Sequence, residues 1–205
     1  MANLFNITYI MANTTNFEKH TNQNPISKFF LDNFSKVLIE SITPLKPQSI
    51  LDVGAGEGFV LEKLRKNKIG KKLEGIEYMD EAIALGKKTN PLVKIKKGDI
   101  YKLPYKDNAF ELIICTEVME HLEDPKMALA ELKRVTSKHI ILSVPNEPLF
   151  TIQRFLRGKN MMKLGDHPEH IQHWNSETFR AFVEDQLTVK EVKTPLPWTM
   201  VIAKK

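Results

Sequence analysis

The sequence predicts an α/β protein built on a mostly parallel sheet. The stretch 49–59 has the pattern of a buried strand, a glycine-rich turn and the start of a helix. Strand-like and helix-like runs then alternate along the chain, a spacing typical of parallel strands joined by crossover helices. Acidic residues also stand at the ends of several predicted strands, where such sheets bind ligands.

The size and composition indicate one soluble domain. The 205 residues can bury a sizeable core, and 42% hydrophobic and 27% charged residues are ordinary values for globular proteins. No apolar run approaches the roughly 20 residues of a membrane span. The start of the chain has neither a basic leader nor an apolar signal segment, and the single cysteine, Cys115, excludes an internal disulfide. We therefore expect a cytoplasmic protein.

Residues 1–47 are predicted to form a flap and a helix within the same unit as the rest. Residues 1–24 are rich in Asn and Thr and show no clear period, but they contain several apolar side chains. We interpret them as a flap over the site. Pro25 starts a helix with regularly spaced apolar positions, which prolines at 44 and 47 end.

The remaining elements follow in order. After the glycine turn the pattern predicts helices at 57–67, 80–88, 124–135 and 175–185, and strands at 73–77, 93–96, 109–115, 139–144, 187–192 and 199–203. The short connection between the last two strands requires an antiparallel pair at the sheet edge.

The glycine turn favours a cationic ligand without phosphate. The glycines between positions 54 and 58 allow a tight turn and a close approach of the ligand. A P-loop would end in Gly-Lys-Ser/Thr, and the dinucleotide fingerprint would have a small residue in place of Phe59. Asp52 and Glu57 would repel a pyrophosphate but suit an ammonium or sulfonium group. S-adenosylmethionine fits these requirements; the alternative is an ordinary β–α turn.

The ends of the next strands extend this site. Glu77 would accept both ribose hydroxyls with its two oxygens. Asp99 follows the third strand and would accept the adenine amino group, while Ile100 would pack on the ring. Glu117 follows the fourth strand. Acidic residues at four successive strand ends indicate a binding site rather than four solvated caps.

These segments resemble motifs of the class I S-adenosylmethionine-dependent methyltransferases. Residues 51–58 resemble the first motif and 75–77 the acidic second-strand motif. Residues 98–114 resemble the adenine-side segment with the fourth strand, and 140–145 the fifth-strand motif. The family's Pro-Gly-Gly turn before strand five is replaced by residues 136–138, Thr-Ser-Lys.

The resemblance covers about residues 26–146 and implies a fold and a site. The fold would be a Rossmann-like three-layer sandwich with a seven-stranded sheet in the order 3-2-1-4-5-7-6, strand seven antiparallel, and an N-terminal helical cap. Residues 48–205 would form the cofactor-binding methyltransferase domain, with a substrate-side insertion at 147–174. The expected cofactor-binding residues are Asp52, Gly54, Ala55, Gly56, Glu77, Tyr78, Gly98, Asp99, Ile100, Thr116 and Glu117.

A second stretch, Glu117–Pro125, points to the acceptor side. On a helical turn Glu117, Glu120 and His121 would share one face. This segment resembles the Glu-x-x-Glu-His segment of ubiquinone-pathway O-methyltransferases. It also resembles the metal-binding segment of small-RNA 2′-O-methyltransferases, in which a histidine before Trp-x-x-x-x-Phe completes the site. His170 holds that position here, ahead of Trp174.

Two chemical interpretations stay open. In the first, His121, together with His167 or His170, acts as general base on an acceptor hydroxyl. In the second, Glu117, Glu120, His121 and His170 bind a divalent metal that lowers the pKa of the acceptor.

The predicted function is methyl transfer to an oxygen, less favourably a nitrogen, of a small or lipid-like acceptor. The insertion mixes basic with apolar residues, which suits peripheral membrane contact or an anionic or lipid-like substrate. Nucleic acid is a less favoured partner because a net charge of +5 is modest for that role. The alternatives are a metal-assisted RNA 2′-O-methyltransferase and a non-catalytic, cofactor-binding regulatory protein.

Overall fold

The computed structural model describes residues 14–21, 23–147 and 171–205. The helices are α1 (Thr15–Thr21), α2 (Pro25–Ile42), α3 (Phe59–Lys66), α4 (Asp80–Thr89), α5 (Pro125–Val135) and α7 (Ser176–Glu184), with 3-10 turns η1 (Thr43–Leu45) and η2 (Met119–His121). The strands are β1 (Ser49–Val53), β2 (Lys72–Glu77), β3 (Ile95–Lys97), β4 (Phe110–Thr116), β5 (Thr136–Pro145), β6 (Thr188–Lys193) and β7 (Trp198–Lys204).

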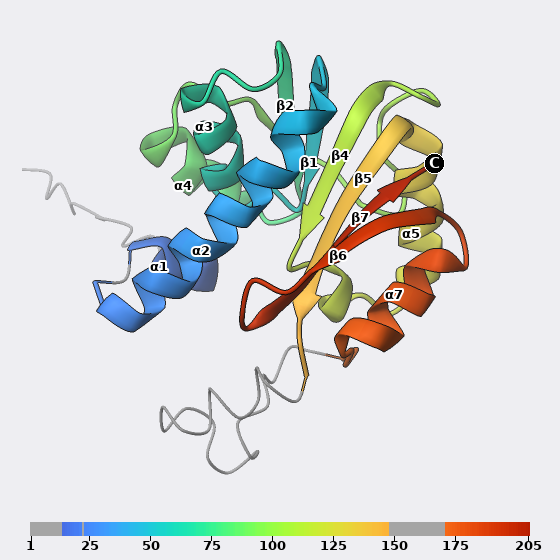
Figure 1. The fold of residues 1–205 in the computed structure, drawn as a ribbon. Helices are drawn as coiled ribbons and strands as arrows, with labels where there is room; N and C mark the ends of the chain where they lie inside the picture. Colours follow the sequence, from blue (N-terminus) through green and yellow to red (C-terminus); the bar gives the residue numbers. More distant parts are fainter. Residues whose placement is uncertain (1–13, 22, 148–170) are drawn as a thin grey trace, which may run out of the picture.

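The strands form one sheet with helices on both faces (Figure 1). The seven-stranded sheet has the order β3-β2-β1-β4-β5-β7-β6. Strands β1 to β5 pair in parallel, whereas β7 runs antiparallel to both β5 and β6. The predicted fold class, strand order and antiparallel edge are thereby confirmed.

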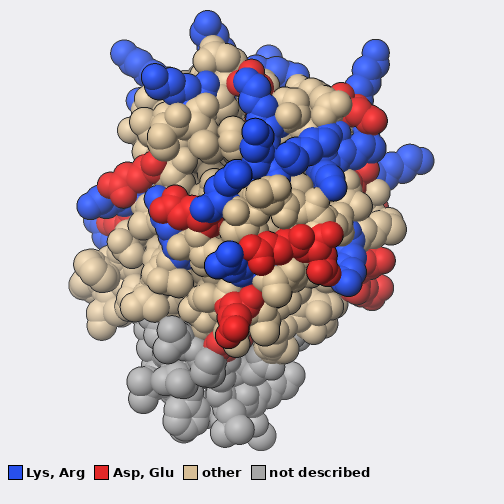
Figure 2. Space-filling model, turned by 45° about the vertical axis from the view of Figure 1, so that its right-hand side comes forward, with Lys and Arg blue, Asp and Glu red and all other residues tan. Residues whose placement is uncertain are grey.

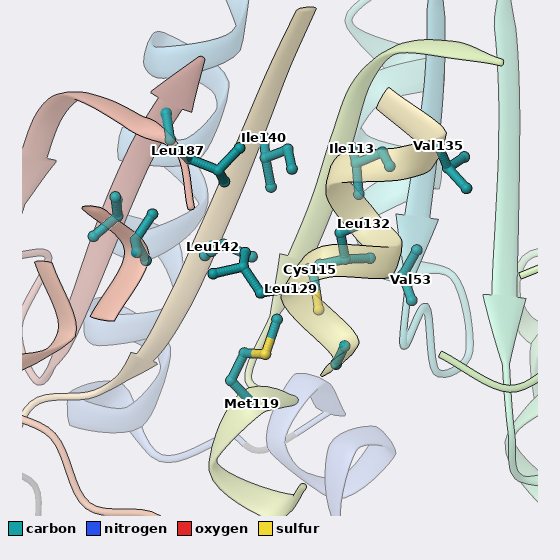
Figure 3. Packing of buried hydrophobic residues seen from close by; sticks show 14 of the residues in the cluster. Val53, Ile113, Cys115, Met119, Leu129, Leu132, Val135, Ile140, Leu142 and Leu187 are labelled. Carbon is teal, nitrogen blue, oxygen red and sulfur yellow. The ribbon is translucent and has the colours of Figure 1, made fainter. Parts of the chain in front are cut away.

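Each face of the sheet buries its own apolar layer because successive strand residues point to opposite sides. Leu51 and Ile113 belong to the cluster that also contains buried residues of α5 and α7, whereas Ile50 and Ile114 belong to the cluster under α2. Figure 3 shows part of the first cluster, with Leu132 of α5 among the labelled side chains. Two covered faces explain why the strands are continuous apolar runs in the sequence.

The structure differs from the predicted elements in two places. Residues 15–21 form helix α1, an element that the sequence pattern did not predict within the proposed flap. Contacts with the glycine turn, which is distant in the sequence, hold this helix. The spacing of apolar residues within the segment does not reveal such contacts. Residues 136–138 are the start of β5 and not a turn, since β5 follows α5 directly and Thr136 pairs with Phe110.

The proposed boundaries remain predictions. Residue 47, the predicted boundary, lies in the loop between η1 and β1. Most of the predicted insertion at 147–174 lies outside the described residues. Among the helices that the structure describes, none is long and apolar enough to cross a membrane.

Candidate functional site

A cavity of about 1170 Å³ lies at the carboxyl ends of the central strands. Every residue predicted to hold the cofactor lines it: Asp52, Gly54, Ala55, Gly56, Glu77, Tyr78, Gly98, Asp99, Ile100, Thr116 and Glu117. Residues of α1 and α2 line other parts of the same cavity. Sites for one drug-sized molecule usually measure about 300–1,000 Å³, so this cavity slightly exceeds the usual range.

The glycine turn has a backbone that only glycine adopts without strain. Gly54 and Gly56 have φ of 76° and 53°. A Cβ atom on Gly54 would lie 2.3 Å from Cγ2 of Val118, and one on Gly56 would lie 2.6 Å from Nδ2 of Asn16. The N–H groups of Gly54 and Ala55 both donate to the carbonyl of Ile76, at 2.8 and 3.0 Å. These contacts fix the turn against β2.

Asp52 presents a buried acid to the cavity. It is 2% exposed, and Oδ2 has no hydrogen-bond partner among the described residues. Burial and, to a smaller extent, the neighbouring Glu77 raise the pKa of Asp52 to about 7. A buried oxygen without a partner is costly, and a cationic ligand group would supply one.

Glu77 organises the turn as well as facing the cavity. One oxygen accepts the N–H of Gly56 at 2.8 Å, and the other accepts those of Tyr78 and Met79 at 2.7 and 2.8 Å. A carboxylate has about four acceptor positions, so one remains for a ligand. The prediction that Glu77 accepts both ribose hydroxyls therefore requires one hydroxyl to share an acceptor position with a backbone N–H group.

Glu57, which the sequence suggested would attract a cationic ligand group, instead binds the segment at the start of α1. It is fully buried, and its two oxygens accept hydrogen bonds from the hydroxyl of Thr14 and the amide of Asn16. The backbone carbonyl of Glu57 accepts from Nδ2 of Asn90 at 3.0 Å. Glu57 thus ties the segment at the start of α1 to the glycine turn.

Glu117 is held by side chains from three other elements. Its φ is 59°, in the left-handed region, where β4 ends. Oε1 accepts from the hydroxyl of Ser143 at 3.2 Å, and Oε2 accepts from the indole N–H of Trp198. Lys19 of α1 lies 3.8 Å from Oε2 and 4.7 Å from the centre of the Trp198 ring. Burial raises the pKa of Glu117, an effect that Lys19 opposes.

Glu120 and His121 also line the cavity, but not on the predicted turn. The left-handed residue Glu117 separates β4 from the 3-10 turn, so Glu117 is not part of that helix and the predicted shared helical face is wrong. Glu120 is 1% exposed, and neither carboxylate oxygen has a hydrogen-bond partner in the described part of the chain. Burial, and then repulsion by Glu117, raise the pKa of Glu120 well above its usual range.

The predicted metal site stays a prediction, because His170 lies outside the part of the chain that the structure describes. No group of three or more His, Cys, Asp or Glu side chains there is placed to hold an ion. Glu117 is instead engaged with Trp198 and Ser143. His167 and His170 lie outside the described residues.

Sequence reasoning expected a flap from residues 1–24 over the site but missed the two residues that α1 and β7 contribute beside Glu117. Lys19 and Trp198 line the cavity and contact Glu117. Trp198 and Glu117 are 81 positions apart, and no local pattern links them. Their contact follows from the antiparallel pairing of β7 with β5, whose end residues are Trp198 and Pro145.

Comparisons with known proteins find similar sequences among methyltransferases. Residues 51–143 match the sequence model of a family described as a methyltransferase domain. Norajmaline N-methyltransferase of Rauvolfia serpentina is 32% identical over 75% of this chain and 56% of its own length. The mitochondrial ubiquinone biosynthesis O-methyltransferase of Saccharomyces cerevisiae is 28% identical over 78% of this chain and 56% of its own length.

The fold is also shared with solved structures. The crystal structure of an S-adenosylmethionine-dependent methyltransferase from Aquifex aeolicus has a TM-score of 0.67 and 21% identity, with 94% of this chain and 99% of that chain covered. This similarity concerns the fold. The chain spans less than two thirds of the length of the curated relatives named above.

Proposed function

The chain belongs to the class I S-adenosylmethionine-dependent methyltransferases, and we propose that it transfers a methyl group from this cofactor to an oxygen of a small or lipid-like acceptor. The proposal rests on the cavity, because the predicted cofactor residues and a second, more apolar region line the same cavity. That region is lined by Phe30, Phe34 and Leu38 of α2.

The residues at the strand ends fit the cofactor. The unpartnered oxygen of Asp52 would meet its ammonium or sulfonium group, and the remaining acceptor position of Glu77 would meet the ribose. Asp99 and Ile100 would contact the adenine. When bound, S-adenosylmethionine supplies a methyl group that its sulfonium has already made reactive. The protein then contributes mainly proximity and an in-line orientation of the acceptor.

An oxygen acceptor is proposed because a hydroxyl has to lose its proton to become a good nucleophile. His121 lines the cavity and would take that proton as general base. Trp198 and the apolar face of α2 would position the body of the acceptor. The relatives include both O- and N-methyltransferases, so the choice of oxygen rests on this arrangement.

The described basic side chains are unevenly distributed over one face of the protein. On the face in Figure 2, lysine and arginine side chains of the described residues gather in the upper half. Figures 1 and 2 share the vertical axis, and Figure 1 shows β4 running downward, so the upper half is the end where the parallel strands begin. The described basic residues of this face therefore lie at the end of the sheet opposite to the cavity.

The proposed function is tested by turnover with methyl-labelled S-adenosylmethionine and a panel of hydroxylated aromatic and lipid-like compounds, amines and short RNAs. We expect label on a hydroxylated compound, together with release of S-adenosylhomocysteine. Replacing His121 with alanine should lower kcat about 100-fold or more and leave cofactor affinity unchanged. The control His173→Ala changes an exposed histidine that does not line the cavity and should behave like wild type.

Other outcomes would decide between the alternatives. Label found only on RNA and lost with a chelator would indicate a metal-assisted RNA methyltransferase. Tight cofactor binding without turnover across the panel would favour a regulatory protein.

Cofactor affinity should depend on pH through Asp52. With a pKa of about 7 in the free protein, this group is largely protonated at pH 6 and ionised at pH 8. A cationic ligand binds the ionised form, so the affinity for S-adenosylmethionine is expected to rise between about pH 6 and pH 8, by up to tenfold per unit below the pKa. Calorimetric titrations of wild type and Asp52→Asn measure this, and the variant should bind more weakly with no such slope.

S-adenosylhomocysteine, which lacks the sulfonium charge, identifies the group that Asp52 meets. A slope shared by both ligands indicates the ammonium group, and a slope found only with S-adenosylmethionine indicates the sulfonium. A flat profile for both ligands with wild type would contradict the assignment of Asp52.

A further inference from the structure

The cavity extends into a space between α2 and α3, the α2–α3 recess. It is lined by Phe30, Leu31, Phe34, Ser35, Leu38 and Ile39 of α2 and by Phe59, Val60 and Lys63 of α3. In Figure 1 the two helices lie side by side over the same face of the sheet. Ser35 and Lys63 are the polar side chains in this otherwise apolar set.

Lys63 is a half-buried cation that lines the recess. Its ammonium group donates to the hydroxyl of Ser35, and it forms no ion pair with a carboxylate of the described residues. Burial lowers the pKa of Lys63, which the exposed Asp32 partly opposes. By contrast, Lys66 on the same helix is exposed and lies 3.5 Å from the carboxylate of Glu62. Burying a cation without a counter-charge is costly unless a ligand supplies one.

The neighbouring groups compensate this positive charge only in part, through Asp32. His20 of α1 stacks on Phe59, with ring centres 4.1 Å apart. Burial, and then the charges of Lys19 and Lys63, lower the pKa of His20 to about 3, so the imidazole is neutral near pH 7. One cavity therefore has acidic groups at the strand ends and a cation in the recess.

We propose that Lys63 forms a subsite for a carboxylate in the α2–α3 recess. Ser35 positions the ammonium group, because its hydroxyl accepts from Lys63 and donates its own proton to the carbonyl of Leu31 at 2.7 Å. A single ammonium group matches one carboxylate, whereas a phosphate group usually recruits several donors, often arginine. The apolar lining suits a carboxylate carried on an apolar body. The carboxylate belongs either to the methyl acceptor or to the amino-acid part of the cofactor, and both sources rest on the proposed function.

Two ligand pairs that differ in a carboxylate separate these sources. The first pair is S-adenosylhomocysteine and its decarboxylated analogue, which keeps the ammonium group. The second is decanoate and decanol, titrated with S-adenosylhomocysteine present. Wild type should prefer the carboxylate by about tenfold or more in at least one pair, the size of a charged hydrogen bond. A preference in the first pair identifies the cofactor as the source, and in the second pair the acceptor.

Variants then assign the preference to Lys63. Lys63→Met keeps an unbranched apolar stem without the charge and should abolish the preference, whereas the control Lys66→Met should keep it. A Lys63→Met protein that retains the full preference overturns the proposal, and so does a wild-type protein that prefers neither carboxylate. The wild-type comparison stands even if Lys63→Met does not fold. If wild type fails to bind S-adenosylhomocysteine, the proposed function is contradicted. Decanoate and decanol, titrated without S-adenosylhomocysteine, still test the subsite in that case.

Discussion

Replacing Glu77 with alanine is expected to weaken S-adenosylmethionine binding by about 100-fold or more. Each hydrogen bond to a charged group contributes about 1.5–3 kcal/mol, and the change removes the acceptor for the ribose. It also releases the N–H groups of Gly56, Tyr78 and Met79, which shape the ligand side of the turn. Calorimetric titration with S-adenosylmethionine measures the loss directly.

A matched charge change on the next helix provides the control. Glu81 is exposed on α4 and does not line the cavity, so Glu81→Ala should bind the cofactor like wild type. Thermal unfolding of both variants, compared with wild type, tests whether the fold is retained. Unchanged affinity in Glu77→Ala would remove the assignment of this residue to the ribose.

Replacing Gly54 with alanine is expected to lower the free energy of unfolding by about 2–5 kcal/mol. A left-handed backbone costs a non-glycine residue roughly 1–2 kcal/mol. The new methyl group would also meet Cγ2 of Val118 at 2.3 Å, and overpacking of this kind costs about 1–3 kcal/mol. Urea-induced unfolding measures the change.

A second substitution separates these two costs. Val118→Ala removes the clashing methyl group, so it should destabilise the Gly54→Ala protein less than it destabilises wild type, or even stabilise it. The part of the loss due to the left-handed backbone should remain. Additive losses in the double variant would mean that the close approach of the turn to Val118 is not the cause.

Much of the fold could be predicted because its signals are local. Apolar runs covered on both faces, helical spacing after Pro25 and the short connection before β7 each follow from neighbouring residues. The order of the strands came from the resemblance of residues 51–58 and 75–77 to known motifs. The cofactor residues could be placed together because parallel strands end at one edge of the sheet.

The rest depends on contacts between distant segments. Helix α1 is held by the contacts of Glu57 with Thr14 and Asn16, which no periodicity within residues 1–24 reveals. The acceptor side was predicted from a helical turn that the left-handed conformation of Glu117 interrupts. Lys63 has the sequence pattern of a surface lysine, and only the packing of α3 beside α2 places it in the cavity.

The central claim is that the cavity at the strand ends binds a cationic nucleoside without phosphate. Calorimetric titration of the protein with S-adenosylmethionine and with ATP at the same pH tests it most directly. We expect one molecule of S-adenosylmethionine to bind with a dissociation constant in the micromolar range, about −8 kcal/mol, and ATP to give no measurable heat of binding. Binding of ATP in preference to S-adenosylmethionine, or of neither ligand, would contradict the account.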